Sequence, residues 1–185
     1  MNDHDVPILT LEPLIQAVRT GLEGSGWTLS GLQKTTSHEF EGRWAGESTR
    51  SAYLFFHRDE REEPVEIDVY LDETSRGLTG TLALVVDLRD LGEAGPVPEL
   101  LERLATLAAE RLPRGCRTPL SLRFGLPDRG VGVGAAETEV RFKLRIPRRS
   151  IEEGAAAVVD LTGGTVSAFE RLLDEPELHA VMAPV

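Results

Sequence analysis

The feature that most constrains the fold of this chain is a strict alternation of apolar and polar residues in the segment 65–72. One set of alternate positions is aliphatic and the other is acidic or phenolic: Val65, Ile67, Val69 and Leu71 against Glu66, Asp68, Tyr70 and Asp72. Because successive side chains of a strand point to opposite faces, this pattern predicts a strand with one dry face and one wetted face. We therefore expect a sheet with one side in the core and the other in water.

Further strands follow from the same period of two and from the turn residues between the segments. They are predicted at residues 27–36, 52–58, 78–87, 120–126 and 140–146, the last two as a hairpin. Tyr53 and Phe55 alternate with Leu54 and Phe56, so we interpret the segment 52–58 as buried on both faces. The segment 78–87 is the best candidate for a central strand, and the polar stretch 39–46 is interpreted as a ragged hairpin or long loop.

Helices are predicted where apolar residues recur at intervals of three and four positions. Four such segments are present, at residues 11–24, 97–112, 150–161 and 166–173. Thr10 is positioned to cap the first helix, and Ser150 with Glu153 forms a capping box for the third. We expect Gly163 and Gly164 to separate the third helix from the fourth.

The order of these elements defines the predicted fold class. Short turns between strands favour antiparallel pairing, so we expect an α+β fold: a single antiparallel sheet of about five to six strands with amphipathic helices packed on one face and at the ends. The whole chain, 1–185, is predicted to be one globular domain with flexible tails at 1–9 and 183–185. This order of elements is similar to that of secretion-chaperone-like domains, and the resemblance implies helices flanking a twisted sheet and, commonly, a homodimer.

Charge and composition exclude several classes of function. The 31 acidic and 20 basic residues give a formal net charge of −11, which disfavours nucleic-acid binding. The chain has neither an apolar run long enough to cross a bilayer nor a signal-peptide pattern, so we expect a cytoplasmic protein that does not bind membranes. The single cysteine, Cys116, permits no intramolecular disulfide.

No pattern of residues predicts a metal, a cofactor or a catalytic group. The four histidines are scattered, at positions 4, 38, 57 and 179, without the spacing of paired metal ligands. Alternating glycines at Gly130 to Gly134 lack the lysine and hydroxyl residue of a phosphate-binding loop, so we interpret them as part of a hairpin connection. The acidic residues of the segment 59–73 are interpreted as a solvated face.

A local reversal of charge marks the candidate binding residues. Arg141, Lys143 and Arg145 share one face of a predicted strand, Arg123 lies on the preceding strand, and Arg148 and Arg149 follow directly. We predict that these six residues form a cationic surface that binds an acidic partner. The alternative is that the arginines neutralise the carboxylates of the acidic strand within the same sheet. The sequence leaves both readings open.

Three hypotheses for function follow, in order of preference. The first is a non-enzymatic protein-binding module, such as a chaperone, an adaptor or an immunity-type partner, that uses the charge-segregated sheet face and pairs with another protein or with itself. The second is a small-molecule or anion-binding protein, or an enzyme, with a pocket between sheet and helices that brings together Arg123, Arg141 or Arg145 with His57 or Glu66. The third is an acidic mimic of nucleic acid.

Overall fold

Six strands of the chain form one antiparallel sheet, as predicted. The computed structural model describes residues 6–37, 49–58, 65–88, 97–124 and 138–182. The strands are β1 (Thr28–Ser37), β2 (Thr49–His57), β3 (Val65–Thr74), β4 (Gly77–Leu88), β5 (Ser121–Phe124) and β6 (Thr138–Arg145). Their order in the sheet is β1-β2-β3-β4-β6-β5, so β4 has a neighbour on each side, as expected of a central strand. The hairpin of β5 and β6 is also confirmed.

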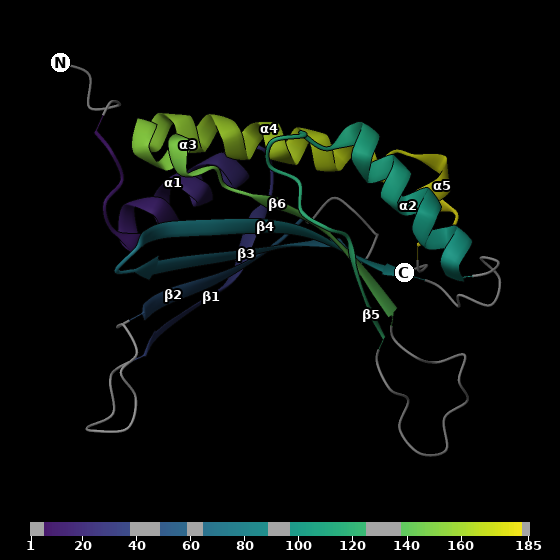
Figure 1. Ribbon diagram of the computed structural model, residues 1–185, viewed down its shortest axis with the longest axis horizontal. Coiled ribbons are helices and arrows are strands. Elements are labelled where there is room, and N and C mark those ends of the chain that lie inside the picture. The colour runs from purple at the N-terminus through teal and green to yellow at the C-terminus, as the bar shows by residue number, and fades with distance from the viewer. Residues whose placement is uncertain (1–5, 38–48, 59–64, 89–96, 125–137, 183–185) are drawn as a thin grey trace.

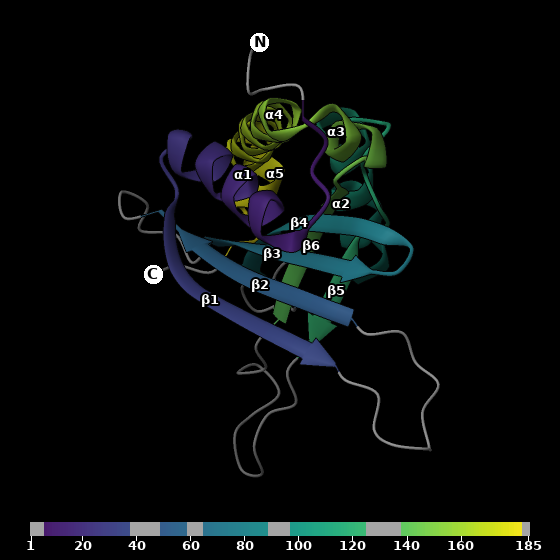
Figure 2. The same cartoon turned by 90° about the vertical axis from the view of Figure 1, so that its left-hand side faces the viewer.

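The helices lie on one face of this sheet (Figures 1 and 2). They are α1 (Leu11–Gly24), α2 (Val97–Arg111), α3 (Arg148–Glu153), α4 (Ala155–Leu173) and α5 (Pro176–His179). The alternation in β3 is confirmed, because Val65, Ile67, Val69 and Leu71 are all buried. The largest fully buried side chains come from the first loop, the sheet and α4: Trp27, Phe56, Phe142 and Phe169. The α+β fold therefore has two layers with the core between them.

The C-terminal helices differ from the sequence prediction. The break lies at Gly154, whose φ of 107° is a conformation that side-chain-bearing residues rarely adopt, and α4 then runs without interruption through Gly163 and Gly164. Each interior glycine costs a helix about 1 kcal/mol relative to alanine. Burial of the apolar face of α4 against α1 and the sheet outweighs this cost, because tertiary packing supplies most helical stability in proteins.

The predicted capping box does not form. Ser150 and Glu153 lie inside α3, whose N-cap is Pro147, and neither side chain caps a helix end. Near the other terminus, Ile8 is buried, although it belongs to the segment expected to be a tail. Its N–H donates a hydrogen bond to the carbonyl of Ile151 at 3.1 Å. The N-terminal segment is thereby fixed to α3.

Several expectations concern parts of the chain outside the described residues. They are the loop 39–46, the acidic residues 59–63, Leu126, the glycines at 130–134 and the tail 183–185. Within the described ranges, no helix is both long and apolar enough to cross a membrane.

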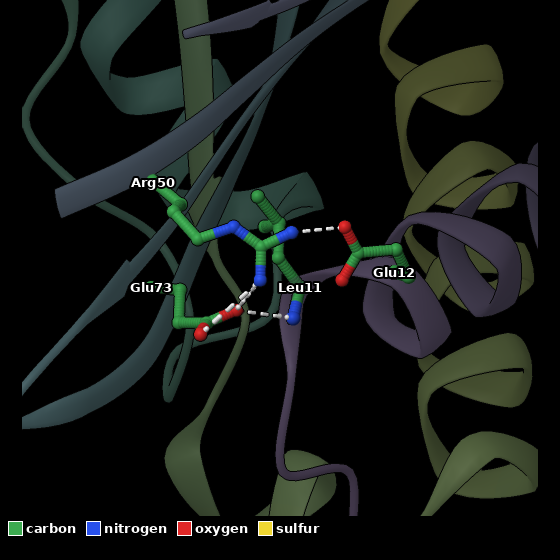
Figure 3. A network of polar contacts seen from close by, with 4 residues as sticks. All are labelled: Leu11, Glu12, Arg50 and Glu73. Atoms are coloured by element: carbon green, nitrogen blue, oxygen red, sulfur yellow. Dashed lines mark hydrogen bonds and ion pairs between the residues drawn. The ribbon is translucent and has the colours of Figure 1, made fainter. Parts of the chain in front are cut away.

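The start of α1 is capped from the sheet. Thr10 occupies the N-cap position, as predicted, but its side chain makes no hydrogen bond to the helix end. Instead, the N–H of Leu11 donates to Oε2 of Glu73 on β3 at 2.7 Å. Arg50 on β2 lies between the two elements, where it bonds Glu73 at 3.2 Å and also pairs with Glu12 (Figure 3). A carboxylate distant in sequence therefore satisfies the exposed positive end of the helix.

The capping bond predicts unequal effects of two alanine substitutions. Glu73→Ala removes a charge-assisted acceptor, so it should lower the free energy of unfolding by about 1–2 kcal/mol. Thr10→Ala removes no cap bond and should change that free energy by less than about 0.5 kcal/mol. Urea denaturation followed by circular dichroism measures both. A larger loss for Thr10→Ala than for Glu73→Ala would show that the threonine is the functional cap.

Candidate functional site

The face of the sheet opposite the helices carries a group of exposed aromatic side chains. Leu54 and Phe56 of β2 are fully buried under the helices, whereas Tyr53 and Phe55 of the same strand are 37% and 36% exposed. Tyr70 of β3 is 38% exposed. The prediction that β2 is buried on both faces is therefore wrong, because no described helix or strand covers this second face (Figure 1). We call it the open face, and we call Tyr53, Phe55 and Tyr70 the aromatic cluster.

Strand register holds the aromatic cluster together. Tyr53 is directly opposite Tyr70, and their ring centroids are 4.8 Å apart at an interplanar angle of 45°. Phe55 is opposite Gly31 of β1, where an added Cβ would lie only 3.2 Å from the phenyl ring. The glycine thus lets the ring lie against bare backbone. Partial burial, with a hydrogen bond to the Asp72 carboxylate, raises the pKa of Tyr70 to about 12, so its phenol stays neutral near pH 7.

A network of ion pairs occupies the other half of the open face. Arg141 of β6 bonds Asp68 of β3 at 2.8 Å and the neighbouring Glu139 at 2.7 Å. Arg123 of β5 reaches the same Glu139 at 3.1 Å. Two of the predicted cations therefore neutralise carboxylates of their own sheet, which is the alternative that the sequence left open.

The carboxylates of this network have opposite pKa shifts. Burial raises the pKa of Asp68 above its usual value, although the charge and the hydrogen bond of Arg141 oppose that effect. For Glu139, burial alone would raise the pKa, but the hydrogen bonds and charges of Arg141 and Arg123 hold it below the usual value. Desolvation therefore disfavours the charged form of Asp68, whereas the two arginines stabilise the charged form of Glu139.

The remaining predicted cations fall into two groups. Lys143 and Arg145 lie on the open face of β6, and within the described part of the chain neither forms an ion pair. Arg148 and Arg149 instead lie on α3 in the helical layer, where they pair with Glu152 at 2.8 Å and Glu153 at 2.6 Å. The structure therefore does not gather the six residues on one surface. We call Lys143 and Arg145 the cationic pair.

The groups considered for proton transfer do not line the grooves that the structure describes. One groove of about 720 Å³ lies on α2 and includes Glu102, Leu107 and Glu177. Another of about 360 Å³ lies between α2 and the segment 117–120. Neither contains His57, Glu66 or an arginine of the open face. The described histidine, cysteine and acidic residues also include no group of three that could hold a metal ion.

Two further titratable groups are shifted toward their neutral forms. Burial, followed by the charges of Asp68 and Asp87, raises the pKa of Glu66. Burial also raises the pKa of the half-buried Cys116 thiol, which makes it a weaker nucleophile at neutral pH. Comparison with known proteins adds no further constraint, because no protein-family model, curated protein or solved structure matches this chain.

Proposed function

We propose that the chain is a non-enzymatic, cytoplasmic protein-binding module whose open face docks another protein. The observation that carries the proposal is the exposure of the aromatic cluster on a face that no described helix covers. Tyrosine and phenylalanine are enriched at protein interfaces because they bury a large area at a low cost in conformational entropy. Three such side chains exposed together fit a docking surface better than a solvated one.

The construction of the open face also supports docking. The aromatic cluster stands on β2 and β3, which are hydrogen-bonded on both sides within the sheet, so the backbone beneath it is held in place. A surface that is already ordered loses little conformational entropy when a partner binds. Its rim is polar, with Ser51 donating to Asp72 at 2.5 Å beside the tyrosines. Apolar centres with polar rims are typical of specific interfaces.

The proposal predicts that binding depends on the two tyrosines. A partner recovered from the native host with the wild-type chain would be purified, and its Kd measured by titration calorimetry. Tyr53→Ser together with Tyr70→Ser should raise Kd by about tenfold or more, because each substitution removes an aromatic contact. Circular dichroism checks that the doubly substituted chain remains folded.

A control for the tyrosine substitutions removes exposed apolar side chains outside the open face. Val6 and Leu9 precede α1 and are 64% and 80% exposed, so Val6→Ser with Leu9→Ser should leave Kd within about twofold. An unchanged Kd after the tyrosine substitutions would refute the proposal, as would a wild-type chain that remains monomeric and recovers no partner. Self-association that is abolished by the same substitutions would identify a second copy of the chain, and not a different protein, as the occupant.

A further inference from the structure

We infer that the partner docked on the open face presents an acidic segment with an apolar anchor. The anchor contacts the aromatic cluster, and the carboxylates of the segment contact the cationic pair. This inference rests on the proposed function and specifies the chemistry of the partner. Its basis is the strand register, which places each residue of the cationic pair in one row across the sheet with a member of the aromatic cluster.

Residue pairing defines the two rows. The first row runs across β2, β3, β4 and β6 through Tyr53, Tyr70, Thr81 and Arg145. The second runs across the same strands through Phe55, Asp68, Ala83 and Lys143. Each row therefore begins with an aromatic ring on β2 and ends with a cation on β6, with a short side chain on β4 between them.

The dimensions of a sheet fix the spacing that a partner must match. Neighbouring strands are about 4.8 Å apart, so the backbones under Tyr53 and Arg145 are separated by about 14 Å, and those under Tyr70 and Arg145 by about 10 Å. Lys143 and Arg145 are two residues apart on one strand, which corresponds to about 7 Å. The short side chains of Thr81 and Ala83 leave a low strip between the two ends. A segment that crosses the strands can thus place an apolar side chain and two carboxylates at once.

At the cationic pair, the charges on the open face favour an acidic segment. Arg141 and Arg123 already pair with Asp68 and Glu139, so these carboxylates are not available to the cationic pair. Lys143 and Arg145 have no such pairing among the described residues, and charge complementarity with a partner would supply it. A nucleic acid is disfavoured because its continuous phosphates would meet a chain of net charge −11.

Selection from a random-peptide library tests the inference directly. Peptides selected on the wild-type chain should be enriched in aspartate or glutamate together with aromatic or aliphatic residues. Selection on the Lys143→Gln, Arg145→Gln chain should retain the apolar enrichment and lose the acidic one. The Kd of a peptide selected on the wild type should rise about five- to tenfold on this variant, measured by fluorescence anisotropy at about 0.1 M salt.

The chain itself supplies a control with the same change of charge. Arg148→Gln with Arg149→Gln removes two cations from the helical layer and should leave the Kd within about twofold. Selected peptides without acidic enrichment, or an unchanged Kd for the Lys143→Gln, Arg145→Gln chain, would overturn the inference. So would binding of a thymidine oligonucleotide that the same substitutions abolish.

The tyrosine variant separates this inference from the function on which it rests. If Tyr53→Ser with Tyr70→Ser abolishes peptide binding while the lysine and arginine substitutions have no effect, the open face docks proteins but does not select acidic ones. If the tyrosine substitutions also have no effect, the docking function itself is refuted. If both pairs weaken binding and the selected peptides are acidic, both are supported.

Discussion

Replacing Gly21 of α1 with leucine is expected to lower the free energy of unfolding by about 3 kcal/mol, because α1 and α4 are in direct contact there. A Cβ atom at Gly21 would lie 2.8 Å from Cβ of Thr162 and 2.9 Å from the carbonyl oxygen of Val159. The second neighbour is backbone and cannot rotate away, so the two helices would have to separate. Denaturant unfolding followed by circular dichroism measures the loss.

Gly164 of α4 provides the matched control for this substitution. It also lies in a helix, but a Cβ there would meet no atom within 4 Å. Gly164→Leu therefore adds no overlap and improves helix propensity, so it should leave the free energy of unfolding unchanged or raise it by up to about 1 kcal/mol. Equal losses for the two substitutions would contradict the close contact of α1 and α4 at Gly21. A large loss at Gly164 alone would favour the helix break that the sequence suggested.

The contact at Gly21 illustrates which parts of the fold the sequence could predict. The alternation in β3 predicted the strand and its buried face correctly, because a period of two with one aliphatic and one acidic face indicates a half-buried strand. The two glycines of α4 misled the prediction, because helix propensity is a local quantity. Whether α4 continues through Gly163 depends on α1, more than a hundred residues earlier in the chain. The cap of α1 was missed for the same reason, since Glu73 is 62 positions from Leu11.

The candidate site was predictable only in part. Placement of Arg123, Arg141, Lys143 and Arg145 on one sheet face followed from strand period. Which of them are neutralised depends on the neighbours of β6, because β4 places Asp68 within reach of Arg141 and β5 places Arg123 beside Glu139. The aromatic cluster was missed because two apolar faces on β2 are as typical of a buried strand as of a docking strand. One signal was present in the sequence: Tyr70 stands among the acidic residues of the wetted face of β3, and its cross-strand neighbours share that face.

The ion pairs of Arg141 lead to the second large expected effect. Arg141→Gln should lower the free energy of unfolding by about 2 kcal/mol at pH 7, because it leaves Asp68 and Glu139 partly desolvated without their main cation. The side chains of Arg141 and Asp68 are only 21% and 20% exposed, so solvent replaces the lost interaction incompletely. The figure is below the 3–5 kcal/mol typical of fully buried pairs because some screening remains.

This loss should depend on pH with a definite sign. Without Arg141, the folded-state pKa values of Asp68 and Glu139 rise, and a carboxyl group with a raised folded pKa destabilises the fold where it is ionised, a penalty that disappears at low pH. In the wild type, the lowered pKa of Glu139 stabilises the fold at pH values above the ordinary glutamate pKa of 4.5. This stabilisation is lost as the pH falls. The deficit of the variant should therefore shrink from about 2 kcal/mol at pH 7 to less than about 1 kcal/mol near pH 4.

Two further substitutions assign the effect to charge. Arg123 contacts the same Glu139 but is 66% exposed, so Arg123→Gln should cost less than about 0.5 kcal/mol at either pH. Adding Asp68→Asn to Arg141→Gln removes the unpaired carboxylate and should recover about 1 kcal/mol at pH 7. A deficit that is equal at pH 7 and pH 4, and that Asp68→Asn does not relieve, would mean that Arg141 stabilises the sheet through the packing of its aliphatic stem over Val85 and not through its charge.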